Sequence, residues 1–128
     1  AARKIADDAS NADLTALDSL RTTDMTSLRK FSQYNKIFHS KINELSGNQR
    51  HSDVMQNLMD NYERLCIVSL SSVHQESKAM SESLDDHNKI IDALQSRNGR
   101  LAAGLAAKHI RKSLSQVLRG LSNRPIVE

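Results

Sequence analysis

Two polar side chains able to bind a metal lie in the middle of an apolar helical pattern. Asn35 and His39 are four residues apart, so a helix places both on one face. Phe31, Phe38 and Ile42 share that face. Burying an amide or an imidazole among apolar side chains costs free energy unless its polar atoms find partners. The pattern therefore predicts that this pair meets other polar groups inside the protein.

Two later helical patterns each carry one more histidine on an apolar stripe. His87 opens a repeat that Ile90, Ile91 and Leu94 continue at the spacing of an amphipathic helix. His109 ends a series of apolar residues spaced by four in the last helical pattern. His51 and His74 share no clear apolar stripe. His87 and His109 are therefore the expected partners of the first pair.

The predicted site is a divalent metal ion held by Asn35, His39, His87 and His109. A single histidine on an apolar stripe is usually a hydrogen-bonded core residue, but three on three helices can share one ion. Imidazole-rich sites suit zinc, nickel, cobalt or copper better than calcium or magnesium, and zinc or nickel is expected here. Asn35 is a neutral ligand, so the ion would keep its double charge and attract an anion. The alternative for Asn35 is a buried amide that hydrogen-bonds His39.

Three kinds of function fit such residues. In the first, the metal binds a small carboxylate effector, with Arg64 as a candidate to complete the carboxylate pocket. In the second, the histidines are core residues of a metal-free helical interaction module. In the third, the metal activates water in a hydrolase. The third is disfavoured because no HExxH-like motif supplies a general base, and Asp86 and its neighbour His87 point in different directions on a helix.

Length and composition indicate one all-α domain. The chain has 128 residues, 38% hydrophobic and 26% charged, with 3% aromatic residues and a single proline. The apolar content is mostly aliphatic, which favours helices. A net charge of +3 is too mild to indicate a nucleic-acid binder. The single cysteine, Cys66, excludes an intrachain disulfide and fits a cytoplasmic protein. No apolar run is long enough for a membrane span.

An antiparallel bundle of about six helices is expected from the helical periodicity and its interruptions. Ser10 or Asn11 can cap one helix start, and Gly47 suits the end of a later helix. The serine-rich stretch 69–80 is expected to interrupt the pattern, with Ser81 or Ser83 capping the helix that follows. Asn98-Gly99 is expected to end that helix. The predicted helices cover residues 1–8, 11–20, 26–45, 52–72, 81–97 and 100–121.

Several short motifs resemble one known domain family. Asn35-x-x-Phe38-His39, Asp86-His87-x-x-Ile90 and Ala107-x-His109-Ile110 occur in the order and spacing of the FCD domain. That domain is the ligand-sensing part of the FadR branch of GntR transcription regulators. The opening AARKIADDASNADLTAL is similar to its first helices, so the resemblance covers nearly the whole chain.

The resemblance implies a bundle of six or seven helices that binds a divalent metal through an Asp or Asn and through histidines matching His39, His87 and His109. It also implies a small organic acid as effector and a homodimer. The family's winged helix-turn-helix domain is absent from this chain, so residues 1–128 are expected to form a single effector-binding domain that does not itself bind DNA. The family more often has Asp at the position of Asn35, and this difference affects which metal is bound and how tightly.

Overall fold

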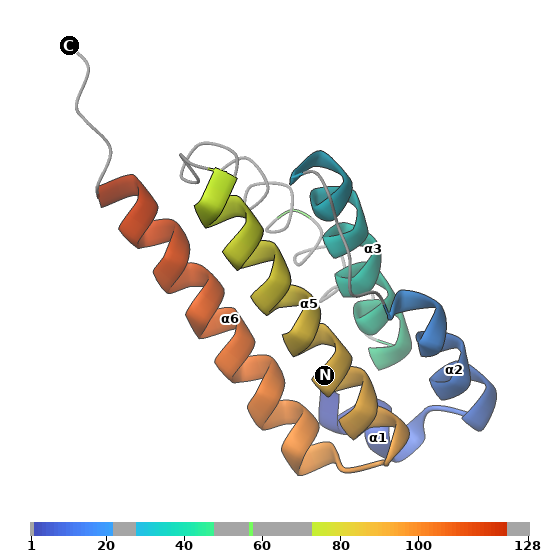
Figure 1. Cartoon of the computed structure of the whole chain (residues 1–128). Coiled ribbons are helices and arrows are strands. Elements are labelled where there is room, and N and C mark those ends of the chain that lie inside the picture. Colours follow the sequence, from blue (N-terminus) through green and yellow to red (C-terminus); the bar gives the residue numbers. More distant parts are fainter. Residues whose placement is uncertain (1, 22–27, 48–56, 58–72, 123–128) are drawn as a thin grey trace.

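The computed structural model is all-helical in the part of the chain that it describes, residues 2–21, 28–47, 57 and 73–122 (Figure 1). This part contains five α-helices and one 3-10 helix, η1, and no strand. The all-α class is confirmed, although the helix count differs from the six predicted, and the predicted helix 52–72 lies outside the described residues except for residue 57. The elements are α1 (Ala2–Asp8), α2 (Asn11–Ala16), η1 (Leu17–Leu20), α3 (Leu28–Ser46), α5 (Val73–Gln95) and α6 (Gly99–Ser122).

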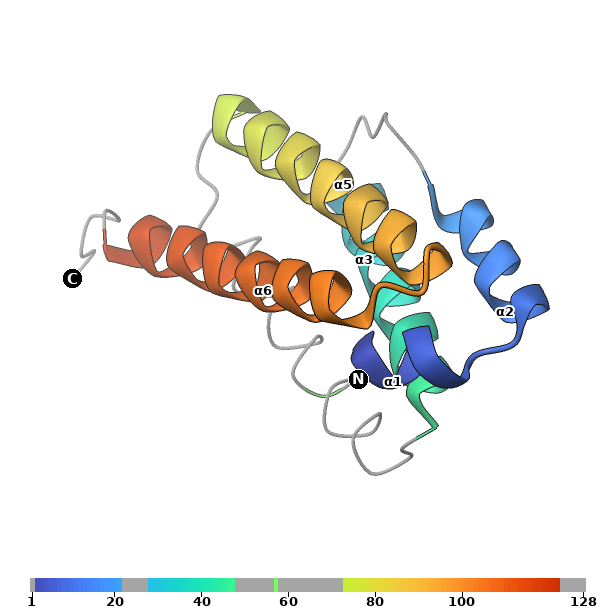
Figure 2. The ribbon, with the colours of Figure 1, turned by 90° about the horizontal axis from the view of Figure 1, so that it is seen from below.

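The two longest helices, α5 and α6, form an antiparallel pair (Figure 1). The helix α3 contacts α5, and α1 packs against α3, α5 and α6 at one end of the bundle (Figure 2). The largest fully buried apolar side chains are Ile5, Leu17, Phe38, Ile91 and Leu94. They come from four of the six elements, so one core joins the N-terminal helices to the three long ones.

The predicted start of α2 is confirmed. Ser10 is the N-cap, and its Oγ accepts a hydrogen bond from the backbone N–H of Asp13 at 3.1 Å. This bond satisfies one of the helix's free N–H groups. At the other boundary, η1 ends at Leu20 and Arg21 is extended. The sequence pattern predicts this break as well.

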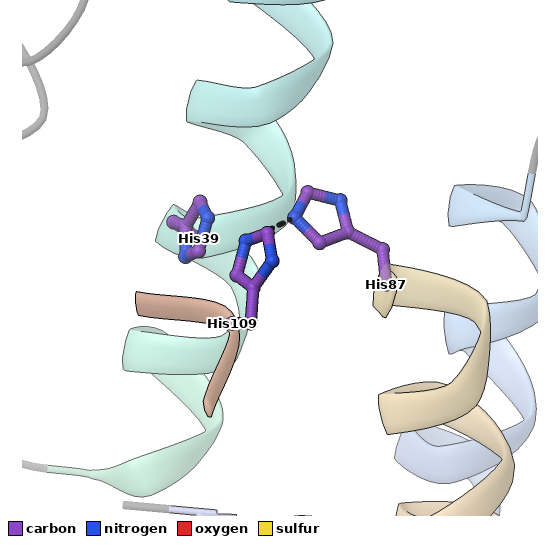
Figure 3. Close-up of side chains that lie close together, drawn as sticks. All are labelled: His39, His87 and His109. Carbon is purple, nitrogen blue, oxygen red and sulfur yellow. Dashed lines mark hydrogen bonds between the residues drawn. The ribbon is translucent and has the colours of Figure 1, made fainter. Parts of the chain in front are cut away.

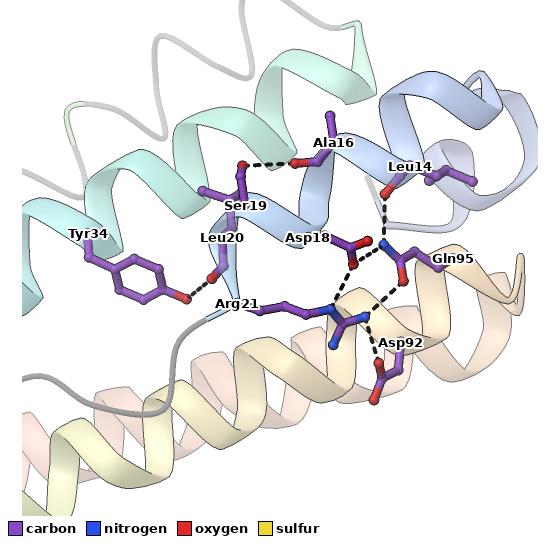
Figure 4. A network of polar contacts seen from close by, with 9 residues as sticks. All are labelled: Leu14, Ala16, Asp18, Ser19, Leu20, Arg21, Tyr34, Asp92 and Gln95. Atoms are coloured by element: carbon purple, nitrogen blue, oxygen red, sulfur yellow. Dashed lines mark hydrogen bonds and ion pairs between the residues drawn. The ribbon is translucent and has the colours of Figure 1, made fainter.

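Arg21 attaches the end of η1 to α5 (Figure 4). Its guanidinium contacts Asp18 at 2.9 Å and Asp92 at 2.7 Å, and it donates to Gln95 Oε1 at 2.8 Å. The Gln95 amide in turn donates to the carbonyl oxygen of Leu14 at 2.9 Å. The short N-terminal helices are thus fixed to α5 by polar contacts as well as by the core.

The helix α5 begins at Val73, so the expected interruption is wrong for residues 73–80, whereas residues 69–72 lie outside the described residues. Ser81 and Ser83 lie inside the helix and do not cap it. Met80 and Leu84 are both buried and continue the apolar stripe toward the N-terminus of the helix. Burial of these side chains outweighs the low helix propensity of the serines around them.

The turn between α5 and α6 differs from the expected Asn98-Gly99 stop. The helix already ends at Gln95, and Arg97 takes the left-handed conformation with φ 54°. Gly99 is instead the first residue of α6. A Cβ built there would lie 3.0 Å from Arg3 Cγ, so glycine permits the close approach of α1. At the end of α3, Gly47 has φ 74°, as predicted for a helix terminus.

The side chain of Arg97 binds the C-terminal end of α1. Its guanidinium donates to the carbonyl oxygens of Ala6 at 3.2 Å and Ala9 at 2.9 Å, and to Asn11 Oδ1 at 2.7 Å. A cation at this position satisfies carbonyls that a helix leaves without internal partners. These bonds anchor α1 to the turn between the two longest helices.

The apolar stripe predicted for α6 is only partly buried. Ala102 and His109, seven residues apart, are buried, and Leu105 is partly buried. Leu101, Ile110 and Leu114, by contrast, are 49%, 53% and 53% exposed. Leu101 directly precedes the buried Ala102, and Ile110 directly follows the buried His109. Neighbouring positions on a helix point in different directions, so both side chains are rotated away from the core.

Candidate metal centre

Three histidines from three helices converge inside the bundle (Figure 3). His39 comes from α3, His87 from α5 and His109 from α6, and their ligand nitrogens all lie within 4.8 Å of one another. The closest pair is His87 Nε2 and His109 Nε2, at 3.1 Å. The sequence pattern predicted that these residues would meet, and the structure brings them together.

The rings are packed at defined angles. Phe38 is 1% exposed and stacks on His87, while its edge-to-face contact with His39 has a centroid distance of 5.3 Å. The His39 and His109 rings are nearly parallel at 5.9 Å. Aromatic contacts of this kind restrict ring rotation, so the imidazoles have little freedom to turn away from one another.

Burial keeps two of the histidines neutral. Burial, followed by the proximity of His109, lowers the pKa of His39 to about 4. Burial, followed by the proximity of the other two histidines, lowers the pKa of His87 to about 2. Metal binding requires an unprotonated nitrogen. At neutral pH these two rings therefore offer lone pairs without first losing a proton.

The outward-facing nitrogens of two histidines have protein partners. His87 Nδ1 lies 3.3 Å from the Tyr34 hydroxyl, which donates to the carbonyl oxygen of Leu20 at 2.8 Å (Figure 4). His109 Nδ1 lies 2.9 Å from Asp86 Oδ2. Histidines that bind metals commonly have such a partner on the second ring nitrogen.

Asp86 is held as a carboxylate. Its partial burial opposes ionisation, but the hydrogen bonds from His109 and Lys112 outweigh that effect and lower its pKa. Lys112 Nζ lies 3.2 Å from the same oxygen that contacts His109. Asp86 therefore points away from its sequence neighbour His87, as helix geometry requires, and reaches the histidine of the next helix.

The donor set fits a transition-metal ion. For metal–nitrogen bonds of about 2.1 Å, two ligand nitrogens of a tetrahedral or octahedral ion lie roughly 2.9–3.4 Å apart. The separation of 3.1 Å between His87 Nε2 and His109 Nε2 falls within that range. The ligand nitrogen of His39 lies within 4.8 Å of the other two, so all three imidazoles are close enough together to form one donor set.

The comparison with known families decides the class of the domain. Residues 1–112 match the FCD domain. The chain belongs to the FCD family. This is a family of regulatory domains of transcription factors and not a known enzyme family. No curated protein and no solved structure matches the chain.

Other predicted residues of this FCD domain have different outcomes. Asn35 is buried, one helical turn before His39, and its role as a ligand stays a prediction. Arg64, His51 and Cys66 lie outside the described residues. His74 falls in the first turn of α5 and not in a loop.

Sequence reasoning missed Tyr34 and Asp86. Tyr34 contacts a histidine 53 positions away, and Asp86 contacts one 23 positions away. The sequence offers only a weak signal for them, which is that both residues lie next to predicted ligands.

Within the described part of this FCD domain, none of the helices has the length and apolar character needed to cross a membrane.

Proposed function

We propose that this FCD domain is the ligand-sensing and dimerisation domain of a GntR/FadR-type transcription regulator of the cytoplasm. It binds a small carboxylate through a divalent metal held by His39, His87 and His109. The observation that carries the proposal is the convergence of three imidazoles from three helices, two of them with Nε2 atoms 3.1 Å apart. Membership of the FCD family supports the regulatory role.

The charge of the proposed metal ligands determines which kind of effector the site attracts. Three neutral imidazoles, with the buried amide of Asn35 as the fourth ligand, leave the charge of a divalent ion uncompensated in the first coordination shell. When bound, zinc or nickel supplies open coordination positions and a positive charge for a carboxylate group. Arg64 is the proposed additional contact for the effector.

The site can sense an effector because its three histidine ligands come from three different helices. A site that needs His39, His87 and His109 together fixes the positions of α3, α5 and α6 relative to one another. An effector regulates only if it binds one arrangement of these helices better than another. In the complete regulator, the change would pass to a winged helix-turn-helix domain on the N-terminal side and to the second subunit of a homodimer.

We propose no catalytic role for the site. Asp86 is the carboxylate closest in sequence to a ligand, and it is engaged by His109 and Lys112. A carboxylate held in this way is poorly placed to take a proton from a metal-bound water. A regulatory site needs no such base.

The test is elemental analysis of the purified chain, followed by thermal-shift measurements with small carboxylic acids, with and without chelator. We expect one equivalent of metal per chain and a lower melting temperature after chelation. Ligand at 100 times its dissociation constant stabilises a fold by about 2.7 kcal/mol. His87→Ala should lose both effects. Absence of metal, together with full effector affinity in His87→Ala, would overturn the proposal in favour of a metal-free helical module.

A further inference from the structure

The hydroxyl of Tyr34 has one proton, and the structure shows where it goes. Tyr34 donates to the carbonyl oxygen of Leu20, a group that can only accept, at 2.8 Å. Toward His87 the hydroxyl can therefore act only as an acceptor. The contact at 3.3 Å requires a proton on His87 Nδ1.

His87 is fully buried, and a neutral imidazole carries a single ring proton. With that proton on Nδ1, its Nε2 has a free lone pair. Asp86 lies on the same helix as His87, and its Oδ2 accepts a hydrogen bond from Lys112 and lies 2.9 Å from Nδ1 of His109 on α6. His109 therefore also carries a proton on Nδ1.

The two lone pairs then face each other. When each ring carries only its Nδ1 proton, His87 Nε2 and His109 Nε2 are both acceptors, and they are 3.1 Å apart. Two acceptors at this distance repel each other unless a cation lies between them. The polar groups behind the two rings thus prepare the site for a positive ion.

We propose that Tyr34 and Asp86 are positioning residues of the metal centre, which fix the ring protons of His87 and His109 on Nδ1 and so turn both Nε2 atoms toward one metal position. The inference rests on the proposed metal binding. The two residues differ in what they add. Tyr34 joins the His87 ring to α3 and η1, whereas Asp86 brings a negative charge behind His109 that the neutral Asn35 does not supply.

The chain offers matched controls for each variant. Tyr34→Phe removes only the hydroxyl and keeps the ring, which packs beside Phe31 and Phe38. Its control is Ser46→Ala on the same helix, which removes another buried hydroxyl that donates to a backbone carbonyl, at 2.6 Å. Asp86→Asn removes a charge from α5. Its control is Asp92→Asn, which removes a charge from the same helix and breaks the ion pair with Arg21.

The first measurement is the affinity of the full chain for Zn²⁺ and Co²⁺ alone, by competition with a chromophoric chelator at one fixed neutral pH. Loss of a partner behind a metal-binding histidine typically costs 10–100-fold in metal affinity. We expect a loss of about that size in Tyr34→Phe and a loss toward the lower end of it in Asp86→Asn, whose amide oxygen can still accept. The two controls should stay within about twofold of the wild type.

The second measurement is the nitrogen–proton correlation spectrum of the imidazole rings in the metal-free chain, which reports the protonated nitrogen directly. His87 and His109 should carry their proton on Nδ1 in the wild type, and Tyr34→Phe should lose that preference at His87. Variants that bind metal like the wild type, or wild-type rings protonated on Nε2, would overturn the positioning role alone. A wild-type chain that takes up no metal would overturn both the proposed function and this role. In that case the spectrum would still show separately whether the ring protons lie on Nδ1.

Discussion

Phe38 lies flat against His87, with ring centroids 3.9 Å apart and ring planes 5° apart. The stacked ring fixes the plane of the imidazole, while the hydrogen bond to Tyr34 fixes its rotation within that plane. The position of His87 Nε2 is thus determined by two residues of α3 and not by α5 alone.

Phe38→Leu should weaken metal binding as well as the fold. Phe38 is almost fully buried, and shortening such a side chain costs on the order of 1–3 kcal/mol in the free energy of unfolding. The control is Phe31→Leu on the same helix, also buried, whose ring contact is with Tyr34. Urea unfolding of the metal-free chains should show similar losses for both, whereas metal titration should show weaker binding only for Phe38→Leu. Equal metal affinity in the two variants would contradict a role for stacking.

Acid should destabilise the metal-free protein before its carboxylates titrate. The pKa of His39 is lowered to about 4 and that of His87 to about 2, chiefly by burial. In the unfolded chain both groups titrate near 6.5, at about the ordinary histidine value. Between these values the unfolded state binds more protons than the folded state, so stability falls as the pH falls below about 6.5.

The expected loss at pH 5 is about 2 kcal/mol for each of the two histidines. Urea unfolding in chelator at pH 7.5 and pH 5 measures it. His39→Gln removes one titrating group and should reduce the difference between the two pH values. A stability that does not change over this range would mean that the buried rings are already protonated in the folded state.

Asn35→Asp should raise metal affinity and lower affinity for anions. A carboxylate one helical turn from His39 would compensate part of the charge of a divalent ion, and we expect a gain of at least about tenfold, or ~1.4 kcal/mol. Without metal, the buried charge should destabilise the fold. Asn43→Asp is the control, because Asn43 is equally buried on the same helix. It should destabilise the fold without improving metal binding, and a similar gain in both variants would exclude Asn35 as a ligand.

Glycine is required at Gly99 but not at Gly104. An alanine Cβ at Gly99 would lie 3.0 Å and 3.3 Å from two atoms of Arg3 and 3.4 Å from Ala6, whereas a Cβ at Gly104 meets nothing within 4 Å. We expect Gly99→Ala to destabilise the protein by about 1–3 kcal/mol. Gly104→Ala should stabilise it by up to about 1 kcal/mol, because Gly104 is exposed inside a helix. Thermal unfolding of the two variants tests this, and equal effects would contradict it.

Helical periodicity was enough to predict where the three histidines go. Each stands on an apolar stripe, and the burial of such stripes against one another brings His39, His87 and His109 together. The end of α3 was predictable for a similar reason, since Gly47 readily takes the left-handed conformation found there.

The contacts that complete the site could not be predicted in this way. Tyr34 and Asp86 meet their histidines across helices, and periodicity along one helix gives no information on the register between two. Predictions from local backbone propensity were also wrong where side-chain packing opposes that propensity. Burial of Met80 accompanies a helix that continues through residues 73–80, and Arg97 takes a left-handed conformation two residues before a glycine that would take it more easily.

Arg97, in the turn between α5 and α6, holds the C-terminal end of α1. The Arg97 guanidinium donates to the Ala6 and Ala9 carbonyls, and Gly99 lets α1 lie directly against the start of α6. A change in the angle between α5 and α6 must therefore carry α1 with it or break these bonds. The first helix of the chain is in this way mechanically coupled to the distance between His87 and His109.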